Sequence, residues 1–94
     1  MTINERIAAV EAELEFAEAA HAAAENAYDE YDLNPAHFKD ADRSARLAEL
    51  FEARCEKAAA TREIGERLDE LKRERFANSK QGQLYANLFK SFNK

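Results

Sequence analysis

Hydrophobic side chains recur along the first third of the chain at alternating steps of four and three residues. This spacing keeps one face of a long helix against a partner helix, as in a coiled coil. The seam consists of Ile3, Ile7, Val10, Leu14, Ala17, His21, Ala24, Tyr28 and Tyr31. No Gly or Pro interrupts it, and Thr2 and Glu5 have the types and spacing of a capping box. The pattern therefore predicts one helix over residues 3–31.

A turn is predicted around Pro35, because a proline disfavours helical angles at the preceding residue. We expect Leu33 and Phe38 to cover the end of a helix pair at this turn. Between residues 41 and 76 the chain contains no proline, and Gly65 is its one weak helix former. The pattern predicts a second long helix over residues 41–76 that folds back on the first.

The sizes of side chains suggest a register for this antiparallel hairpin. If residues whose numbers total 71 or 72 face each other, small side chains meet large ones along most of its length. Leu14 then faces Ala58, and Ile7 faces Gly65, whose bare backbone would make room for the isoleucine. We therefore predict a closely packed hairpin over residues 1–78.

A second apolar face is predicted beside the seam, where the hairpin alone would leave it uncovered. Its members are Ala9, Phe16, Ala20, Ala23 and Ala27 on the first helix and Leu50, Ile64, Leu71 and Phe76 on the second. Phe16 is the most informative of them. An exposed phenylalanine of this kind is usually buried by a third helix or by another chain.

The C-terminal segment, residues 79–94, is predicted to be a hinge followed by a short amphipathic helix. The polar cluster at residues 78–82 marks the hinge. Beyond it, one helical face carries Leu84, Tyr85, Leu88, Phe89 and Phe92. So short a helix is marginal alone and must dock either on its own hairpin or on a second chain. The predicted fold class is all-α: a long, coiled-coil-like antiparallel helical hairpin with a short amphipathic third helix.

Charge is unevenly spread along the chain, whose formal net charge is −5. Residues 1–32 carry nine acidic residues against one basic residue, and residues 67–94 carry seven basic against three acidic. No apolar stretch approaches the length that crosses a bilayer, and we expect no signal peptide. The single cysteine excludes an internal disulfide. Together these features favour a cytoplasmic protein that does not bind membranes.

Candidate chemistry is sparse. His21, Glu25 and Cys55 would approach one another near the middle of the hairpin, but a packed histidine beside a buried thiol is favoured over a metal site. A nucleophilic Cys55 would need a base in a cleft, which two antiparallel helices do not form. We therefore expect no enzymatic activity, no cofactor and no metal.

The aromatic C-terminal helix is the strongest interaction signal, because such aromatic side chains are common anchors in helix-in-groove recognition. We predict a non-enzymatic interaction module that forms a homodimer and binds a larger protein partner, without direct nucleic-acid binding. The predicted contact residues are Phe16, Leu84, Tyr85, Leu88, Phe89 and Phe92.

The acidic first helix suggests an alternative function. A small acidic inhibitor, of a kind that phages often encode, would block or mimic the nucleic-acid site of a larger enzyme complex. Its acidic face would consist of Glu11, Glu15, Glu18 and Glu25. A face that only keeps an alanine-rich helix in solution is the simpler interpretation of the same residues.

Overall fold

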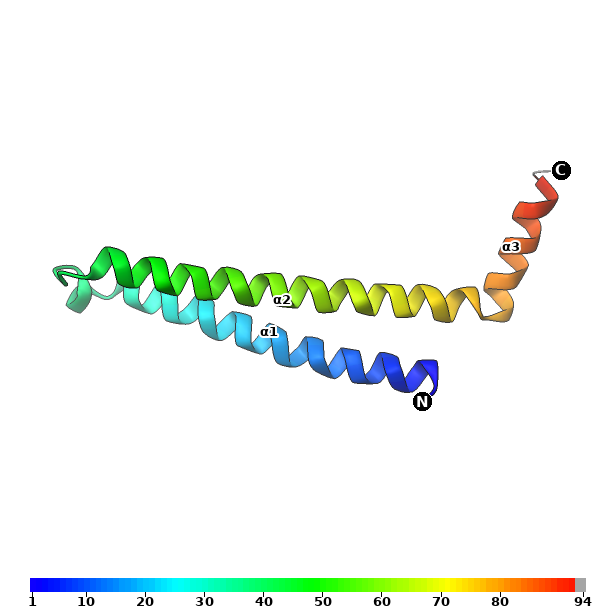
Figure 1. The fold of residues 1–94 in the computed structure, drawn as a ribbon, viewed down its shortest axis with the longest axis horizontal. Helices are drawn as coiled ribbons and strands as arrows, with labels where there is room; N and C mark the ends of the chain where they lie inside the picture. The colour runs from blue at the N-terminus through cyan, green and yellow to red at the C-terminus, as the bar shows by residue number, and fades with distance from the viewer. Residues whose placement is uncertain (93–94) are drawn as a thin grey trace.

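The computed structural model describes residues 1–92 and contains three α-helices and one short 3₁₀ turn. In chain order these are α1 (Ile3–Leu33), η1 (Pro35–His37), α2 (Arg43–Ala77) and α3 (Lys80–Phe92). Helices α1 and α2 lie side by side as an antiparallel hairpin, and α3 extends from its open end (Figure 1). This arrangement confirms the predicted fold class. Residues 93 and 94 of the predicted C-terminal segment lie outside the described residues.

The molecule is a thin rod with extents of 70 × 31 × 15 Å. Its radius of gyration is 21.4 Å, whereas a compact chain of this length has a radius of about 12 Å. Its accessible surface of 7407 Å² exceeds the roughly 5,500 Å² of a compact protein of the same mass. One chain therefore leaves far more surface exposed than a globular domain does.

The N-terminus of α1 is capped by Thr2 as predicted, but the Glu5 carboxylate bonds the Thr2 hydroxyl and not the Thr2 backbone N–H of a complete capping box. The Thr2 hydroxyl oxygen accepts a hydrogen bond from the Glu5 N–H at 3.1 Å and donates one to the Glu5 carboxylate at 3.0 Å. At the other end Asn34 ends α1, and its side chain accepts a hydrogen bond from the Ala36 N–H at 3.0 Å. The asparagine thereby caps η1, which starts at Pro35. Local signals thus define both ends of the first helix.

The seam predicted on α1 is confirmed, since all nine of its residues are buried or partly buried. The buried core is nevertheless small and lies near the open end of the hairpin, where Ile7, Val10 and Leu68 meet. Ile3, Leu14, Ile64 and Leu71 pack around these three side chains. The two helices are held together mainly by this apolar cluster.

The predicted register is wrong. The Thr61 hydroxyl donates to the Ala17 carbonyl oxygen at 3.3 Å, and an Arg67 nitrogen lies 3.2 Å from a Glu13 carboxylate oxygen. The Arg6–Glu74 and Arg54–Glu25 ion pairs and the Tyr28–Phe51 ring contact likewise join residues whose numbers total 79 or 80, not 71 or 72. The Arg43–Asp32 pair beside the turn totals 75, and the contact of Arg54 with the Tyr28 ring totals 82. The second helix is therefore displaced by about two turns, and Leu14 packs near Leu68 instead of facing Ala58.

The displacement has a physical reason. The observed register brings the large side chains of Ile64, Leu68 and Leu71 against Ile7 and Val10. Burying these side chains together removes more apolar surface from water than alternating large with small ones would. Because the seam repeats every seven residues, a shift of about one heptad leaves the α1 seam in place. Matching small side chains with large ones therefore led to a register that is wrong by about one heptad.

In the observed register the predicted second apolar face does not form a single surface. Ile64 and Leu71 belong to the packed cluster between the helices, and Leu50 is partly buried. Phe16, by contrast, is 79% exposed. The apolar residues assigned to one face therefore divide between the seam and isolated exposed positions.

Gly65 does not receive Ile7. A Cβ atom added at Gly65 would meet no atom within 4 Å outside its own helical turn. Because an alanine loses less backbone entropy than a glycine in a helix interior, we predict that Gly65→Ala raises the free energy of unfolding by about 0.5–1 kcal/mol. Urea denaturation followed by circular dichroism measures the change.

Gly82→Ala is the matched control, because an added Cβ at Gly82 would overlap the Phe76 carbonyl group. This variant gains no comparable stability, although it makes the same chemical change. A loss of stability in Gly65→Ala would show that the backbone at Gly65 is closely packed and would contradict the observed register.

Candidate interaction surfaces

The hairpin tip is built from polar side chains. The Tyr31 hydroxyl donates to the Asp40 carboxylate at 3.1 Å, and His37 Nδ1 lies 3.0 Å from the same oxygen. The Tyr31 and His37 rings stack, with centroids 4.5 Å apart and planes inclined by 16°. On the other side of the tip, Arg43 donates to the Asp32 carboxylate at 2.8 Å and to its backbone carbonyl at 3.1 Å. These contacts hold the turn in one conformation.

The prediction that Leu33 and Phe38 cover the end of the helix pair is wrong. Leu33 is 71% exposed and Phe38 54% exposed. The guanidinium of Arg43 lies 5.6 Å from the centre of the Phe38 ring, so the ring packs against a cation at the surface. The stacked Tyr31 and His37 take the position expected of an apolar plug.

The corner between α2 and α3 is short and closely packed. The Asn78 N–H donates to the Glu74 carbonyl at 3.0 Å at the end of α2, and the Ser79 hydroxyl accepts from the Gly82 N–H at 3.0 Å at the start of α3. Gly82 is buried against the Phe76 carbonyl group, where no Cβ would fit. Instead of a hinge over residues 78–82, the chain has a two-residue corner and a helix that starts at Lys80.

This corner points α3 away from the hairpin. In Figure 1, α3 leaves the end of α2 at a steep angle and on the side away from α1. Two contacts connect α3 to the hairpin at the corner: Gly82 packs against the Phe76 carbonyl group, and the Tyr85 and Phe76 rings lie with centroids 6.1 Å apart. The structure therefore leaves most of α3 without contact to its own hairpin.

The apolar face of α3 is exposed along its whole length. The exposed fractions are 64% for Leu84, 58% for Tyr85, 54% for Leu88, 72% for Phe89 and 85% for Phe92. A shallow hollow lined by Gln81, Leu84, Tyr85 and Leu88 lies on this face. We call this surface, together with Phe76 at the corner, the α3 patch. It combines several aromatic side chains on a helix of only 13 residues.

Phe16 does not join the α3 patch. In the observed register Phe16 lies level with residue 62 of α2, which is about 24 Å along the helix from the corner at residue 78. Its side chain is exposed in the middle of the hairpin. The structure thus separates one predicted contact residue from the other five.

The predicted acidic face also divides. Glu25 lies 3.2 Å from His21 Nε2 and 3.9 Å from Arg54 Nε. Glu11, Glu15 and Glu18 are exposed, and no ion pair within residues 1–92 involves them. They occupy successive turns on the other side of the seam from Phe16. We call these three glutamates the acidic ridge.

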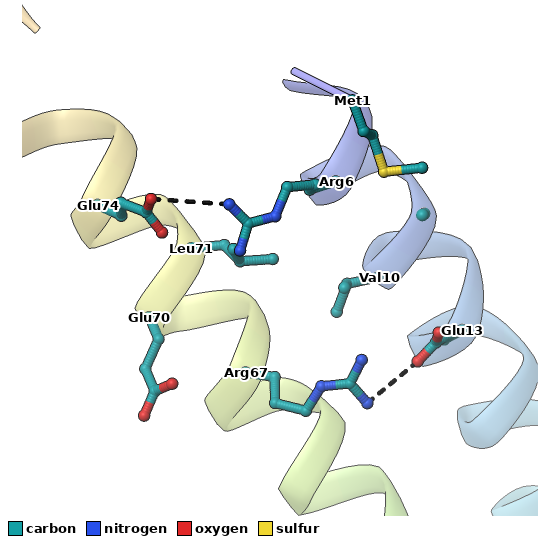
Figure 2. Close-up of a pocket in the computed structure, with 9 residues that line it drawn as sticks. Met1, Arg6, Val10, Glu13, Arg67, Glu70, Leu71 and Glu74 are labelled. Carbon is teal, nitrogen blue, oxygen red and sulfur yellow. Dashed lines mark ion pairs between the residues drawn. The ribbon is translucent and has the colours of Figure 1, made fainter. Parts of the chain in front are cut away.

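A hollow at the open end of the hairpin has charged sides and an apolar floor (Figure 2). Val10 and Leu71 form part of the floor. Across it, Arg6 pairs with Glu74 at 3.7 Å, and Arg67 pairs with Glu13 at 3.2 Å, as Figure 2 shows. These opposite charges already pair across the helices, which leaves Glu70 as the lining side chain with a charge and no ion pair within residues 1–92.

The expected buried thiol is wrong, since Cys55 is exposed. His21 is partly buried on the seam and pairs with Glu25. In the part of the chain that the structure describes, no three His, Cys, Asp or Glu side chains are grouped so that they could hold a metal ion. Within the same residues, no helix combines the length and the apolar character needed to cross a bilayer.

The chain matches no protein-family model, no curated protein and no solved structure. The sequence pattern identified the apolar side chains of α3 but not the corner that exposes them. The polar network at the tip was also missed, because contacts within a turn follow no period.

Burial raises the pKa of Tyr31 above its ordinary value of 10.0, and the hydrogen bond to Asp40 and the charges of Asp40 and Asp42 raise it further. The folded protein thus favours the neutral phenol of Tyr31. The contribution of this side chain to the free energy of unfolding is therefore complete below pH 10 and is lost as the pH rises through the raised pKa. We predict that the difference in unfolding free energy between the wild type and Tyr31→Phe shrinks above pH 10.

The measurement is urea denaturation of both proteins between pH 8 and pH 11, since the lysines common to both cancel in the difference. The phenolate absorbance of the wild type minus that of the variant should titrate above pH 10. If the Tyr31 phenol instead titrates at or below pH 10, its burial at the tip and its hydrogen bond to Asp40 are contradicted.

Proposed function

We propose that this protein is a non-enzymatic, all-helical protein–protein interaction module that self-associates and binds a larger protein through its exposed apolar side chains. The observation that supports this proposal best is the α3 patch. It holds several large apolar side chains on a short helix that the corner keeps away from its own hairpin. Exposed apolar patches of this kind mark interaction sites in soluble proteins.

The shape of the chain supports self-association independently. A single chain exposes 7407 Å², which is on the order of 1,900 Å² more than a compact protein of its mass. A standard interface buries about 800 Å² per partner. Covering part of the excess by a second copy would bring the ratio of surface to mass closer to that of a stable globular protein.

We predict that the wild type has a larger mass in solution than the 10.7 kDa of one chain, and that Phe89→Ala weakens the assembly. A buried aromatic anchor contributes about 2 kcal/mol or more, so the dissociation constant should rise at least roughly thirtyfold. Light scattering coupled to size exclusion over a concentration series measures it.

Lys90→Ala is the matched control, because Lys90 lies on the polar side of α3, and this variant should assemble like the wild type. Removing residues 79–94 should abolish the assembly. A strictly monomeric wild type would refute self-association.

The acidic ridge supports a second candidate function. Three exposed glutamates on successive turns, unpaired within residues 1–92, form a line of negative charge on α1. Such a line would attract a basic nucleic-acid-binding surface, and salt would weaken the attraction by screening. As an inhibitor, the protein would occupy the nucleic-acid site of a larger enzyme complex.

We predict for this second function that a partner captured from the native host by the immobilised protein is lost in Glu11→Lys/Glu15→Lys/Glu18→Lys. Raising the salt concentration from 0.1 to 0.5 M should release the same partner from the wild type. Glu56→Lys/Glu63→Lys/Glu66→Lys, on exposed positions of α2, makes the same change of charge and should retain it. If the ridge variant binds normally and Phe89→Ala does not, the apolar route is the correct one.

A further inference from the structure

The α3 patch is free of charge. No acidic residue occurs within residues 76–94, and Lys80 and Lys90 lie on the side of α3 opposite to Tyr85. A partner that meets this patch therefore encounters no charged group, only apolar and aromatic side chains with the Gln81 amide and the Tyr85 hydroxyl among them. Charge complementarity does not select the partner, so shape and spacing must.

The spacing of the patch is self-complementary. Leu84, Tyr85, Leu88 and Phe89 follow one another at steps of one, three and one residues, which read the same in both directions. A second α3 laid antiparallel would place Leu84 against Phe89 and Tyr85 against Leu88. An interface between two copies related by a two-fold axis requires such self-complementarity, because each residue pair occurs twice.

The area of the patch also fits one such interface. Its three aromatic residues on α3 are 58% (Tyr85), 72% (Phe89) and 85% (Phe92) exposed. At about 200 Å² for each aromatic side chain they present on the order of 400 Å². Leu84 and Leu88, both more than half exposed, bring the total towards the roughly 800 Å² that each partner of a standard interface buries.

We propose that α3 pairs antiparallel with α3 of a second copy of this chain, across a two-fold axis that passes close to Tyr85 and Leu88. This inference rests on the proposed self-association and specifies which surface carries it. The corner supports the pairing, because the Ser79 cap and the close approach of Gly82 to Phe76 hold α3 away from its own hairpin. The hairpins of the two copies stay outside the interface.

Opposite charges introduced at Leu88 test this pairing. Leu88 lies near the axis, where it would pack against Tyr85 of the second copy and lie close to that copy's Leu88. In Leu88→Lys and in Leu88→Glu two like charges approach in an apolar interface, so each variant alone should dimerise at least about a hundredfold more weakly than the wild type. An equimolar mixture should recover heterodimers. Analytical ultracentrifugation of the full chains measures all three samples, and circular dichroism verifies that each variant keeps its helix content.

Lys90→Glu, which reverses a charge on the polar side of α3, is the control and should dimerise like the wild type. Dimers in the mixture, together with monomers in each separate variant, support the pairing. If either variant alone dimerises like the wild type, or if the mixture stays monomeric, antiparallel α3 pairing is overturned while self-association through another surface stands. A wild type that is monomeric at 100 μM overturns both.

Discussion

The apolar contact between Ile7, Val10 and Leu68 determines how the rest of the hairpin is arranged. These are the buried apolar side chains that form the core of the described residues, so the most deeply buried apolar surface lies at this end of the rod. Once they meet, the positions of all other cross-helix contacts follow, including the pairing of Arg67 with Glu13. The rod owes its register to a few residues near one end.

The small core explains why the two long helices leave many of their side chains exposed to solvent. A pair of helices only 15 Å thick has no second layer to cover side chains that point away from the seam. Phe16 and the acidic ridge therefore remain at the surface on opposite sides of α1. A hairpin of this kind therefore buries less of its surface than a compact domain of the same mass.

The sequence predicted the elements well because their signals are local. The spacing of four and three residues identified α1, the capping residues located its start, and Pro35 located the turn. The register could not be read in the same way, because a heptad pattern is compatible with shifts of seven residues. Gly65 opposite Ile7 made a plausible size match, yet the packing of Ile64 and Leu71 decided the outcome.

The α3 patch shows the same division between local and long-range signals. The helical period placed the apolar side chains of α3 on one face before any coordinates were known. Their exposure depends on the corner at Ser79, where the hydroxyl caps a helix that starts earlier than the polar composition indicated. The tip network of Tyr31, His37 and Asp40 joins residues from α1 and from the turn, and no periodic signal announces such a contact.

The straight hairpin places its polar tip and α3 at opposite ends of the molecule (Figure 1). Helical rise converts residue number directly into length, at 1.5 Å per residue. The distance between the tip and α3 is therefore set by the number of heptads in the two helices. Removing one heptad from each helix in register would shorten that distance by about 10 Å and leave both ends chemically unchanged.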